Sequence, residues 1–290
     1  MKGMYLALLG TAVCLASLAQ TDTTGKPTGT DTIKVGNMII IKKHDGKEKA
    51  DQPGEKKETD REVQIEIKKR KSHKPSNVST NWWILDLGFA NVNDQTDYAS
   101  AAVTGPGGYF PGGSRNEMSL RNGKSVNVNI WFFQQRVNMI KHVVNLQYGL
   151  GVELNNYRFE KNVRFRYDPA DFIERDPLVA SYRKNKLAAD YVTLPVMLNF
   201  NFTPQKKNGY GFSAGVSAGY LYSARQKLVS GENGKEKIRN DFNLQPWKLS
   251  AIGELNLGAA RLYGSYALNN MFRSGLDQTP YTVGLRLSSW

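Results

Sequence analysis

The chain has 290 residues, a formal net charge of +13, a pI near 9.6 and a mean hydropathy of −0.49. Such a basic balance is typical of proteins that bind nucleic acid or an anionic surface. No internal run of about 18 apolar residues is present, which excludes a helical membrane protein. A transmembrane β-barrel stays open, because each of its strands needs only about ten residues with every second one apolar.

Residues 1–19 have the pattern of a secretory signal peptide. Lys2 precedes the apolar stretch MYLALLGTAVCLASLA, whose last three letters fit a small-x-small cleavage site. The alternative is a core helix that begins the chain. The only cysteine, Cys14, lies inside this segment and follows Val13, where a lipoprotein site has a small residue. We therefore expect an exported chain without cysteine or disulfides.

Residues 20–80 differ in composition from the rest of the chain. Two short β-like runs, TIKVGNMIIIKK and EVQIEIKKRK, flank the charged segment HDGKEKADQPGEKKETDRE. Such a segment buries too little apolar surface to offset its chain entropy. We predict a largely disordered periplasmic leader in which the two runs could pair as a hairpin. The basic run KKRKSHK at 68–74 is either a solvated linker or a contact for anionic headgroups.

From Trp82 onward, apolar residues recur at every second position, which predicts β-strands. In residues 144–155, apolar side chains at even positions alternate with polar residues and glycine at odd positions. The eight segments with this period are WWILDLGFANV at 82–92, VNVNIWF at 126–132, VVNLQYGLGVELNNYRF at 143–159, YVTLPVMLNFNF at 191–202, YGFSAGVSAGYLY at 210–222, WKLSAIGELNL at 247–257, RLYGSYALNN at 261–270 and YTVGLRL at 281–287.

The connections between these segments alternate in length. Short ones lie at NMIK, TPQKKNG and LGAA, and longer ones at 94–123, 160–185 and 229–241, with a shorter fourth near 272–278. Short turns at one end and long loops at the other are the plan of an outer-membrane barrel. We therefore predict an all-β fold, an eight-stranded antiparallel transmembrane β-barrel over residues 81–290. A soluble barrel of the lipocalin type is the alternative.

The signal peptide, the region 82–290, the segments YVTLPVMLNF and GFSAGVSAGYLY and the terminal VGLRL together resemble the outer-membrane β-barrel domain family of Gram-negative bacteria that includes PorT-like proteins. The resemblance covers the barrel and not the leader. It implies a place in the cell outer membrane and a fold, and its patterns of alternation carry no catalytic signature.

In such a barrel the apolar stripe faces lipid and the other face fills the interior. The predicted interior side chains are three acids, three bases and a set of amides: Asp86, Glu153, Glu254, Lys248, Arg261, Arg286, Asn127, Asn129, Asn145, Gln147, Asn199 and Asn201. The charges nearly cancel, and an eight-stranded barrel is just wide enough for side chains to fill it. Inward glycines at 149, 151, 215 and 219 make room for large partners. We predict a packed polar core without an open pore.

Aromatic residues at strand ends predict the girdles that mark the two membrane interfaces. The predicted girdle residues are Trp82, Trp83, Trp131, Phe133, Tyr157, Phe159, Tyr210, Tyr220, Tyr222 and Trp247. Ordinary β-propensity of aromatic residues is the alternative reading of this set. The chain ends on Trp290, which resembles the aromatic terminal signal read by the barrel-assembly machinery.

The second long loop mixes charges of both signs. It carries Arg164, Arg166, Arg175, Arg183 and Lys184 beside Asp168, Asp171, Glu174 and Asp176. The basic side chains could bind lipopolysaccharide phosphates, although mixed charge is also what any exposed loop shows. The expected partners are outer-membrane lipid and lipopolysaccharide, the assembly machinery during biogenesis and envelope proteins. Nucleic acid is not expected, because an exported chain meets little of it.

Nothing in the sequence indicates catalysis. His44 and His73 lie in the leader and His142 follows a short turn, while barrel enzymes commonly need a histidine at the outer rim. No HExxH, Gly-x-Ser-x-Gly or Cys/His cluster is present. The four loop carboxylates could form an incidental cation site, but their spacing matches no calcium loop. We predict no catalytic, cofactor-binding or metal-binding residues.

Two classes of function remain. The first is a closed structural or interaction barrel of the envelope, whose loops or leader engage partners. The resemblance to PorT-like proteins implies a role in secretion or envelope assembly. The second is transport, as a narrow channel or a small-solute barrel, and a lipid-modifying enzyme is a third, weaker alternative.

Overall fold

The computed structural model describes the backbone of residues 30–35, 38–43 and 64–69, and residues 76–287 apart from 169, 178 and 207–208. The predicted signal peptide and Trp290 lie outside the described residues. The chain divides into two units, residues 1–72 and 73–290. Each unit is described by itself.

The first unit holds a small antiparallel sheet in the order β1-β2-β3. Its strands are β1 (Thr30–Val35), β2 (Met38–Lys43) and β3 (Gln64–Lys69). The first β-like run of the leader supplies two strands, β1 and β2, and the second run supplies β3, which pairs with β2. The leader therefore contains a three-stranded sheet where the sequence predicted one hairpin.

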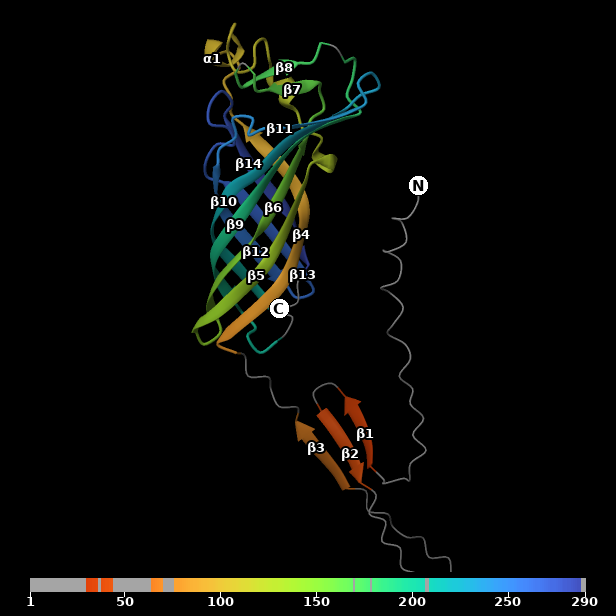
Figure 1. Cartoon of the computed structure of the whole chain (residues 1–290). Helices are drawn as coiled ribbons and strands as arrows, with labels where there is room; N and C mark the ends of the chain where they lie inside the picture. Colours follow the sequence, from red (N-terminus) through yellow and green to blue (C-terminus); the bar gives the residue numbers. More distant parts are fainter. Residues whose placement is uncertain are drawn as a thin grey trace, which may run out of the picture. The chain divides into compact units, whose positions relative to one another are not determined.

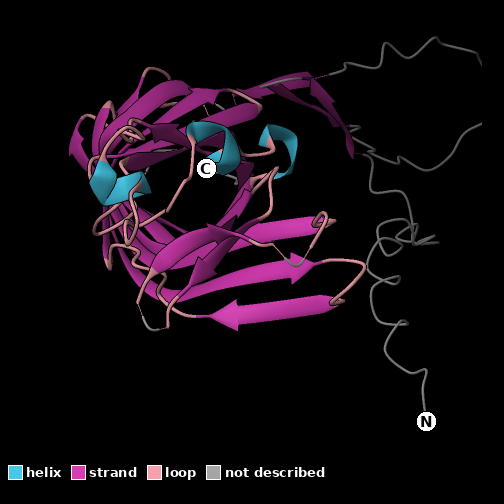
Figure 2. Ribbon diagram, turned by 90° about the horizontal axis from the view of Figure 1, so that it is seen from above, coloured by secondary structure: helices cyan, strands magenta, loops and turns pink. Residues whose placement is uncertain are grey.

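The second unit is a closed antiparallel barrel of eight strands, as predicted (Figures 1 and 2). The strands in ring order are β4 (Val78–Asp94), β5 (Val126–Ile140), β6 (Val144–Arg158), β9 (Lys184–Asn201), β10 (Tyr210–Val229), β12 (Trp247–Leu257), β13 (Ala260–Ala267) and β14 (Gln278–Leu287). Each strand pairs with its successor, and β14 pairs with β4 over ten positions from Gln278↔Asp94 to Leu287↔Leu85. This last pairing closes the ring and leaves no free edge in the wall.

The period-two pattern sorts side chains between the two faces of the wall. In β6, the odd positions from 145 to 157 are buried and the even positions are half-exposed. Large apolar side chains lie exposed on the outer face, among them Leu87, Val192, Leu194, Val283 and Leu285. The interior face is polar, because the polar half of each alternating segment points inward.

The strands are joined by short turns at one end and long loops at the other, as predicted. The turns are residues 141–143, 202–209 and 258–259, and the loops are 95–125, 159–183, 230–246 and 268–277. The loops contain α1 (Ala101–Thr104), η1 (Arg115–Met118), η2 (Asn122–Lys124), the paired strands β7 (Val163–Arg166) and β8 (Phe172–Arg175), and β11 (Lys235–Arg239). In the described part of the chain, no helix has the length and apolar character to cross a membrane.

Irregularities of register interrupt the alternation in the β4–β5, β5–β6 and β9–β10 pairings. The β4–β5 register passes from Trp82↔Phe133 to Ile84↔Trp131, so Trp83 and Phe132 fall outside the ladder, and Trp83 has φ 56°. The β9–β10 register shifts between Leu221 and Ser223. A bulge of this kind reverses which face the following side chains point to.

The predicted girdle is confirmed in part. Six of its residues are at least half exposed: Trp82, Trp83, Tyr210, Tyr220, Tyr222 and Trp247. Trp131, Tyr157 and Phe159 are instead 4%, 2% and 5% exposed, so their assignment to the girdle was wrong. The reason is parity, since Trp131 and Tyr157 fall in phase with the inward asparagines at 129 and 155.

Candidate functional site

The inward glycines create the space that large interior side chains occupy. A Cβ on Gly151 would lie 2.7 Å from Trp131 Cε3, and one on Gly219 would lie 3.3 Å from Tyr191 Cβ. Gly149 and Gly215 likewise face Gln134 and Met197. These four contacts confirm the predicted role of the glycines, and they fix the rings of Trp131 and Tyr191 inside the barrel.

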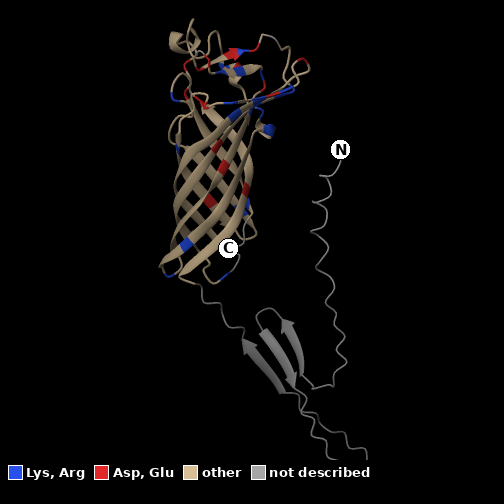
Figure 3. Cartoon of the chain, in the orientation of Figure 1, with Lys and Arg blue, Asp and Glu red and all other residues tan. Residues whose placement is uncertain are grey.

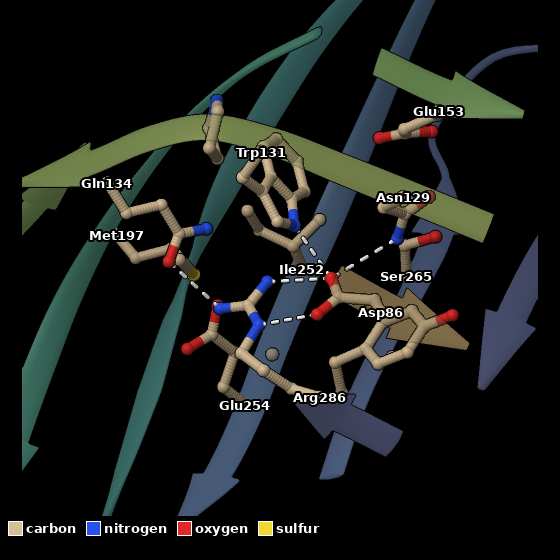
Figure 4. A pocket seen from close by; sticks show the side chains of 14 residues that line it. Asp86, Asn129, Trp131, Gln134, Glu153, Met197, Ile252, Glu254, Ser265 and Arg286 are labelled. Atoms are coloured by element: carbon tan, nitrogen blue, oxygen red, sulfur yellow. Dashed lines mark hydrogen bonds and ion pairs between the residues drawn. The ribbon is translucent and has the colours of Figure 1, made fainter. Parts of the chain in front are cut away.

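Arg286 on β14 lies at the centre of the polar interior (Figure 4). Its Nε and Nη2 donate to the two carboxylate oxygens of Asp86 on β4, at 2.7 and 2.8 Å. Its Nη1 donates to Gln134 Oε1 at 3.1 Å and also pairs with the carboxylate of Glu254 on β12. One guanidinium therefore joins three strands, β4, β12 and β14, and also reaches β5 through Gln134.

Asp86 is fully buried and accepts further hydrogen bonds. The indole Nε1 of Trp131 donates to Asp86 Oδ2 at 2.7 Å, and Asn129 Nδ2 donates to the same oxygen at 3.4 Å. The Arg286 guanidinium also lies 5.8 Å from the Trp131 ring centroid, within cation–π range. A buried charge is costly unless it is paired and hydrogen-bonded, and Asp86 satisfies both conditions.

A second buried ion pair lies nearer the loop end of the barrel. Lys248 on β12 pairs with Glu153 on β6, and both side chains are less than a tenth exposed. The Lys248 Nζ lies 5.2 Å from the Tyr191 ring centroid. Together with the Arg286 cluster, this pair gives each of the three predicted interior acids a cationic partner, with Arg286 shared by Asp86 and Glu254.

Amide side chains add hydrogen bonds across the strands around these ion pairs. Asn127 Nδ2 donates to Asn129 Oδ1 and to Asn155 Oδ1, both at 2.8 Å. Asn145 Nδ2 donates to Asn199 Oδ1 at 3.2 Å. On the side of Glu254, Gln147 Nε2 donates to the carboxylate at 3.2 Å and to Gln134 Oε1 at the same distance. These ion pairs and hydrogen bonds thus join ten of the twelve predicted interior residues, the set without Arg261 and Asn201, inside the barrel.

The Arg286 cluster leaves only a small space beside it. A cavity beside Arg286, between Trp131 on β5 and Glu254 on β12, leaves ≈ 20 Å³ for the centres of water molecules. A single water needs about 10–15 Å³ of such volume. The interior therefore has room for about one water at this point.

The four long loops pack on one another and form a cap with an apolar core at the loop end of the barrel. Each loop contributes at least one buried aromatic ring: Tyr109, Phe110, Phe159, Phe165, Phe242 and Phe272. The Phe165 ring lies 5.7 Å from Phe242 and 6.2 Å from Phe272, centroid to centroid. The cluster continues into the upper barrel through Tyr157, Leu187 and Tyr191.

Ion pairs hold the second loop to its neighbours. Arg164 pairs with Asp176 at 3.3 Å and with Glu236 on β11 at 2.5 Å, and Arg166 pairs with Glu174 at 2.6 Å. Arg175 pairs with Glu117 of the first loop. Most of the basic side chains that were candidates for lipopolysaccharide contact are thus occupied by carboxylates of the cap itself.

Tyr182 belongs to the same loop. Its hydroxyl donates to Asp176 Oδ2. Burial, reinforced by this hydrogen bond and by the nearby carboxylate charge, raises the pKa of Tyr182 to about 12.

The structure places the remaining candidate residues apart from one another. Glu174 and Asp176 face different arginines, and within the described ranges no three His, Cys, Asp or Glu side chains are grouped as a metal site would require. His142 lies in the turn between β5 and β6 with φ 60°, at the end of the barrel opposite the cap. The interior roles of Trp131, Gln134 and Tyr263 were not predicted, although the odd numbers of Trp131 and Tyr263 place them in phase with Asn129 and Arg261.

The comparison with known families agrees with this architecture. Residues 88–273 match the family model described as outer membrane protein beta-barrel domain. No curated protein matches the chain at a significant level.

Proposed function

Because the chain belongs to the outer membrane protein β-barrel domain family, we propose that it is a closed barrel of the outer membrane that serves as a structural or interaction protein of the cell envelope. The observation that carries this proposal is the filled interior. The Arg286 cluster and the Lys248–Glu153 pair lie one above the other within the barrel, and the loop cap lies beyond them.

An ion would have to break several strong contacts to cross this barrel. It would first displace the apolar cap, whose core excludes water, and then separate Lys248 from Glu153 and Arg286 from Asp86. Breaking one buried pair costs about 3–5 kcal/mol. A path with two such steps and an apolar barrier is a poor route for a solute.

Conductance of the purified full chain in planar bilayers tests the closed state. We expect a silent membrane at applied voltages of either sign. Steady openings would favour the second candidate function, a narrow channel, for which the cavity beside Arg286 is the supporting observation. An Arg286→Gln variant measured in parallel distinguishes a leak created by loss of the interior network from native conduction.

The proposal also takes the chain to be non-catalytic and to act through contacts. Its support is the position of His142, in a turn away from the cap and without a described carboxylate partner. Lipid A profiles of cells that carry His142→Ala test this point, and an altered acyl pattern would contradict it.

The partners we propose are proteins of the envelope, with a role in secretion or assembly suggested by the resemblance to PorT-like proteins. Affinity purification of the full chain, with and without residues 20–80, tests whether the leader recruits them. Equal recovery of envelope proteins in both experiments would mean that the leader is a spacer.

A further inference from the structure

The wall of the barrel extends beyond the outer girdle as a sheet of β6, β9, β10 and β11. At this end β10 pairs with β9 up to Val229↔Lys184 and with β11 from Arg225↔Arg239 to Val229↔Lys235. One face of the extension packs on the cap: Phe165 N donates to Gln226 Oε1 at 3.0 Å, and Asn185 Nδ2 donates to the Val163 carbonyl at 2.6 Å. The other face is turned away from the cap.

This second face is strongly basic, and we call it the basic face. It consists of Arg158, Lys184, Lys186, Arg225, Lys227, Lys235, Lys237 and Arg239. The pairing register aligns Arg158, Lys186, Lys227 and Lys237 in one row across four neighbouring strands. Figure 3 shows Lys and Arg gathered on β10 and β11 at the loop end.

Few acids balance these charges. Arg225 pairs with Asp190, and Lys186 Nζ donates to the neutral side chain of Asn156. Among the residues that the structure describes, no carboxylate lies within ion-pair distance of Lys184, Lys227, Lys235, Lys237 or Arg239. Like charges directly opposite in a sheet are destabilising, and the neighbouring Arg239 and other cations lower the pKa of Lys237. The row therefore repels itself unless an anion from outside binds it.

The height of the basic face above the membrane indicates which anion it meets. Tyr220 and Tyr222 on β10 and Trp247 on β12 form part of the girdle on the side of the loops, which in this fold is the outer side. At about 3.3 Å per residue, Arg225 and Lys227 lie about 10 and 17 Å beyond Tyr222 along the strand. The tilt of the strands reduces this height further, so the charges lie at the level of headgroups and the first sugars of the outer leaflet.

We propose that the basic face is a binding site for a phosphorylated glycolipid of the outer leaflet, with the row Lys186, Lys227 and Lys237 contacting its phosphates. The inference uses the position of the barrel in the outer membrane and is independent of whether the barrel conducts. Acyl chains of the same lipid would lie against the apolar wall below, where Val192 and Leu194 on β9 are exposed. A soluble anion has no such second contact.

Native mass spectrometry of the detergent-solubilised full chain tests the proposal, with titration of lipid A that carries its phosphates and of lipid A from which they have been removed. The test variant is Lys186→Gln/Lys227→Gln/Lys237→Gln. The matched control removes three other exposed lysines, Lys124, Lys141 and Lys206, each by substitution with Gln. A Lys→Arg triple variant at the three test positions serves as the rescue.

We expect the wild type, the control and the Lys→Arg variant to prefer phosphorylated lipid A. At about fivefold per basic residue, the Gln triple variant should bind it about 100-fold more weakly. Unchanged binding by the Gln triple variant, or equal binding of both lipids by the wild type, would overturn the proposal. Equally tight binding of soluble polygalacturonate would overturn the assignment to a lipid. If the triple variant fails to fold, the Lys227→Gln/Lys237→Gln variant provides the same comparison.

Discussion

Replacing Arg286 with Gln removes the cation that two interior acids share. The substitution removes the ion pair of Asp86, which is fully buried, and one of the positive charges that act on the partly buried Glu254. Breaking a buried pair in this way costs about 3–5 kcal/mol. Asp86 keeps its hydrogen bonds from Trp131 Nε1 and Asn129 Nδ2, so we expect a loss of about 3–4 kcal/mol in the free energy of unfolding.

Urea unfolding of the chain in lipid vesicles, followed by tryptophan fluorescence, measures this loss. Trp131 reports on the site directly, because its indole contacts Asp86. The matched control is Arg273→Gln: Arg273 pairs with Asp241 at 2.9 Å, but both side chains are more than two-fifths exposed. An exposed ion pair contributes about 0–1 kcal/mol to stability. In the Arg286→Gln variant the free energy of unfolding should therefore fall by about 2 kcal/mol or more beyond the loss in the control.

A triple variant, in which Arg286 and both of its acidic partners become neutral, distinguishes the effect of an unpaired charge from the effect of altered packing. In Asp86→Asn/Glu254→Gln/Arg286→Gln the two acids are removed together with the guanidinium that they share, so neither carboxylate remains beside a missing cation and amide hydrogen bonds can replace the ion pairs. We expect stability within about 1.5 kcal/mol of the wild type. Equal losses for Arg286→Gln and Arg273→Gln, or no recovery in the triple variant, would refute the electrostatic account of the interior.

Two further predictions concern the space inside the wall and the chemistry of the cap. Gly151→Ala should lower the free energy of unfolding by about 1–3 kcal/mol, because the added methyl group overpacks against Trp131. Gly253→Ala is the control: its Cβ would have Ser213 O at 3.8 Å as its nearest contact, so its stability in the same urea assay should be unchanged or slightly higher. A larger loss of stability for Gly253→Ala than for Gly151→Ala would contradict the packing argument. Because the pKa of Tyr182 is raised to about 12 in the folded chain, the unfolded chain releases this proton first, so the stability of the cap should fall as pH rises from about 10 to 12. Proteolysis of the loops across this range should show the fall in the wild type and a smaller one in Tyr182→Phe; identical pH profiles would show that another group is responsible.

The sequence predicted the strands and the closed ring because both follow from one repeated pattern. Alternation identified Asp86, Lys248 and Arg286 as interior residues, and the structure confirms their burial and their ion pairs. The same parity rule would have placed Trp131 inside as well, in phase with Asn129, but its large aromatic ring was read as a sign of the membrane interface. For Trp131, the residue type predicted a place at the membrane interface and the strand phase predicted a place in the interior, and the phase was correct.

The bulges and the cap could not be predicted in the same way. Trp83 and Phe132 are left out of the ladder because of how two strands pair, and the sequence of a single strand does not predict this. The loops have no regular period, so Phe165 and Phe242 gave no sign that their rings would meet across 77 positions of chain. The aromatic residues of the loops were the one available sign of this packing, because loops that are fully solvated seldom contain several large aromatic rings.

The cap also constrains the order in which the molecule can be built. Its core includes Phe272 and Leu276 from the fourth loop, which precedes the last strand. The rings of the first three loops therefore have no complete partner set until the C-terminal hairpin has joined the sheet. The complete cap therefore requires that the fourth loop, and with it the C-terminal hairpin, is in place.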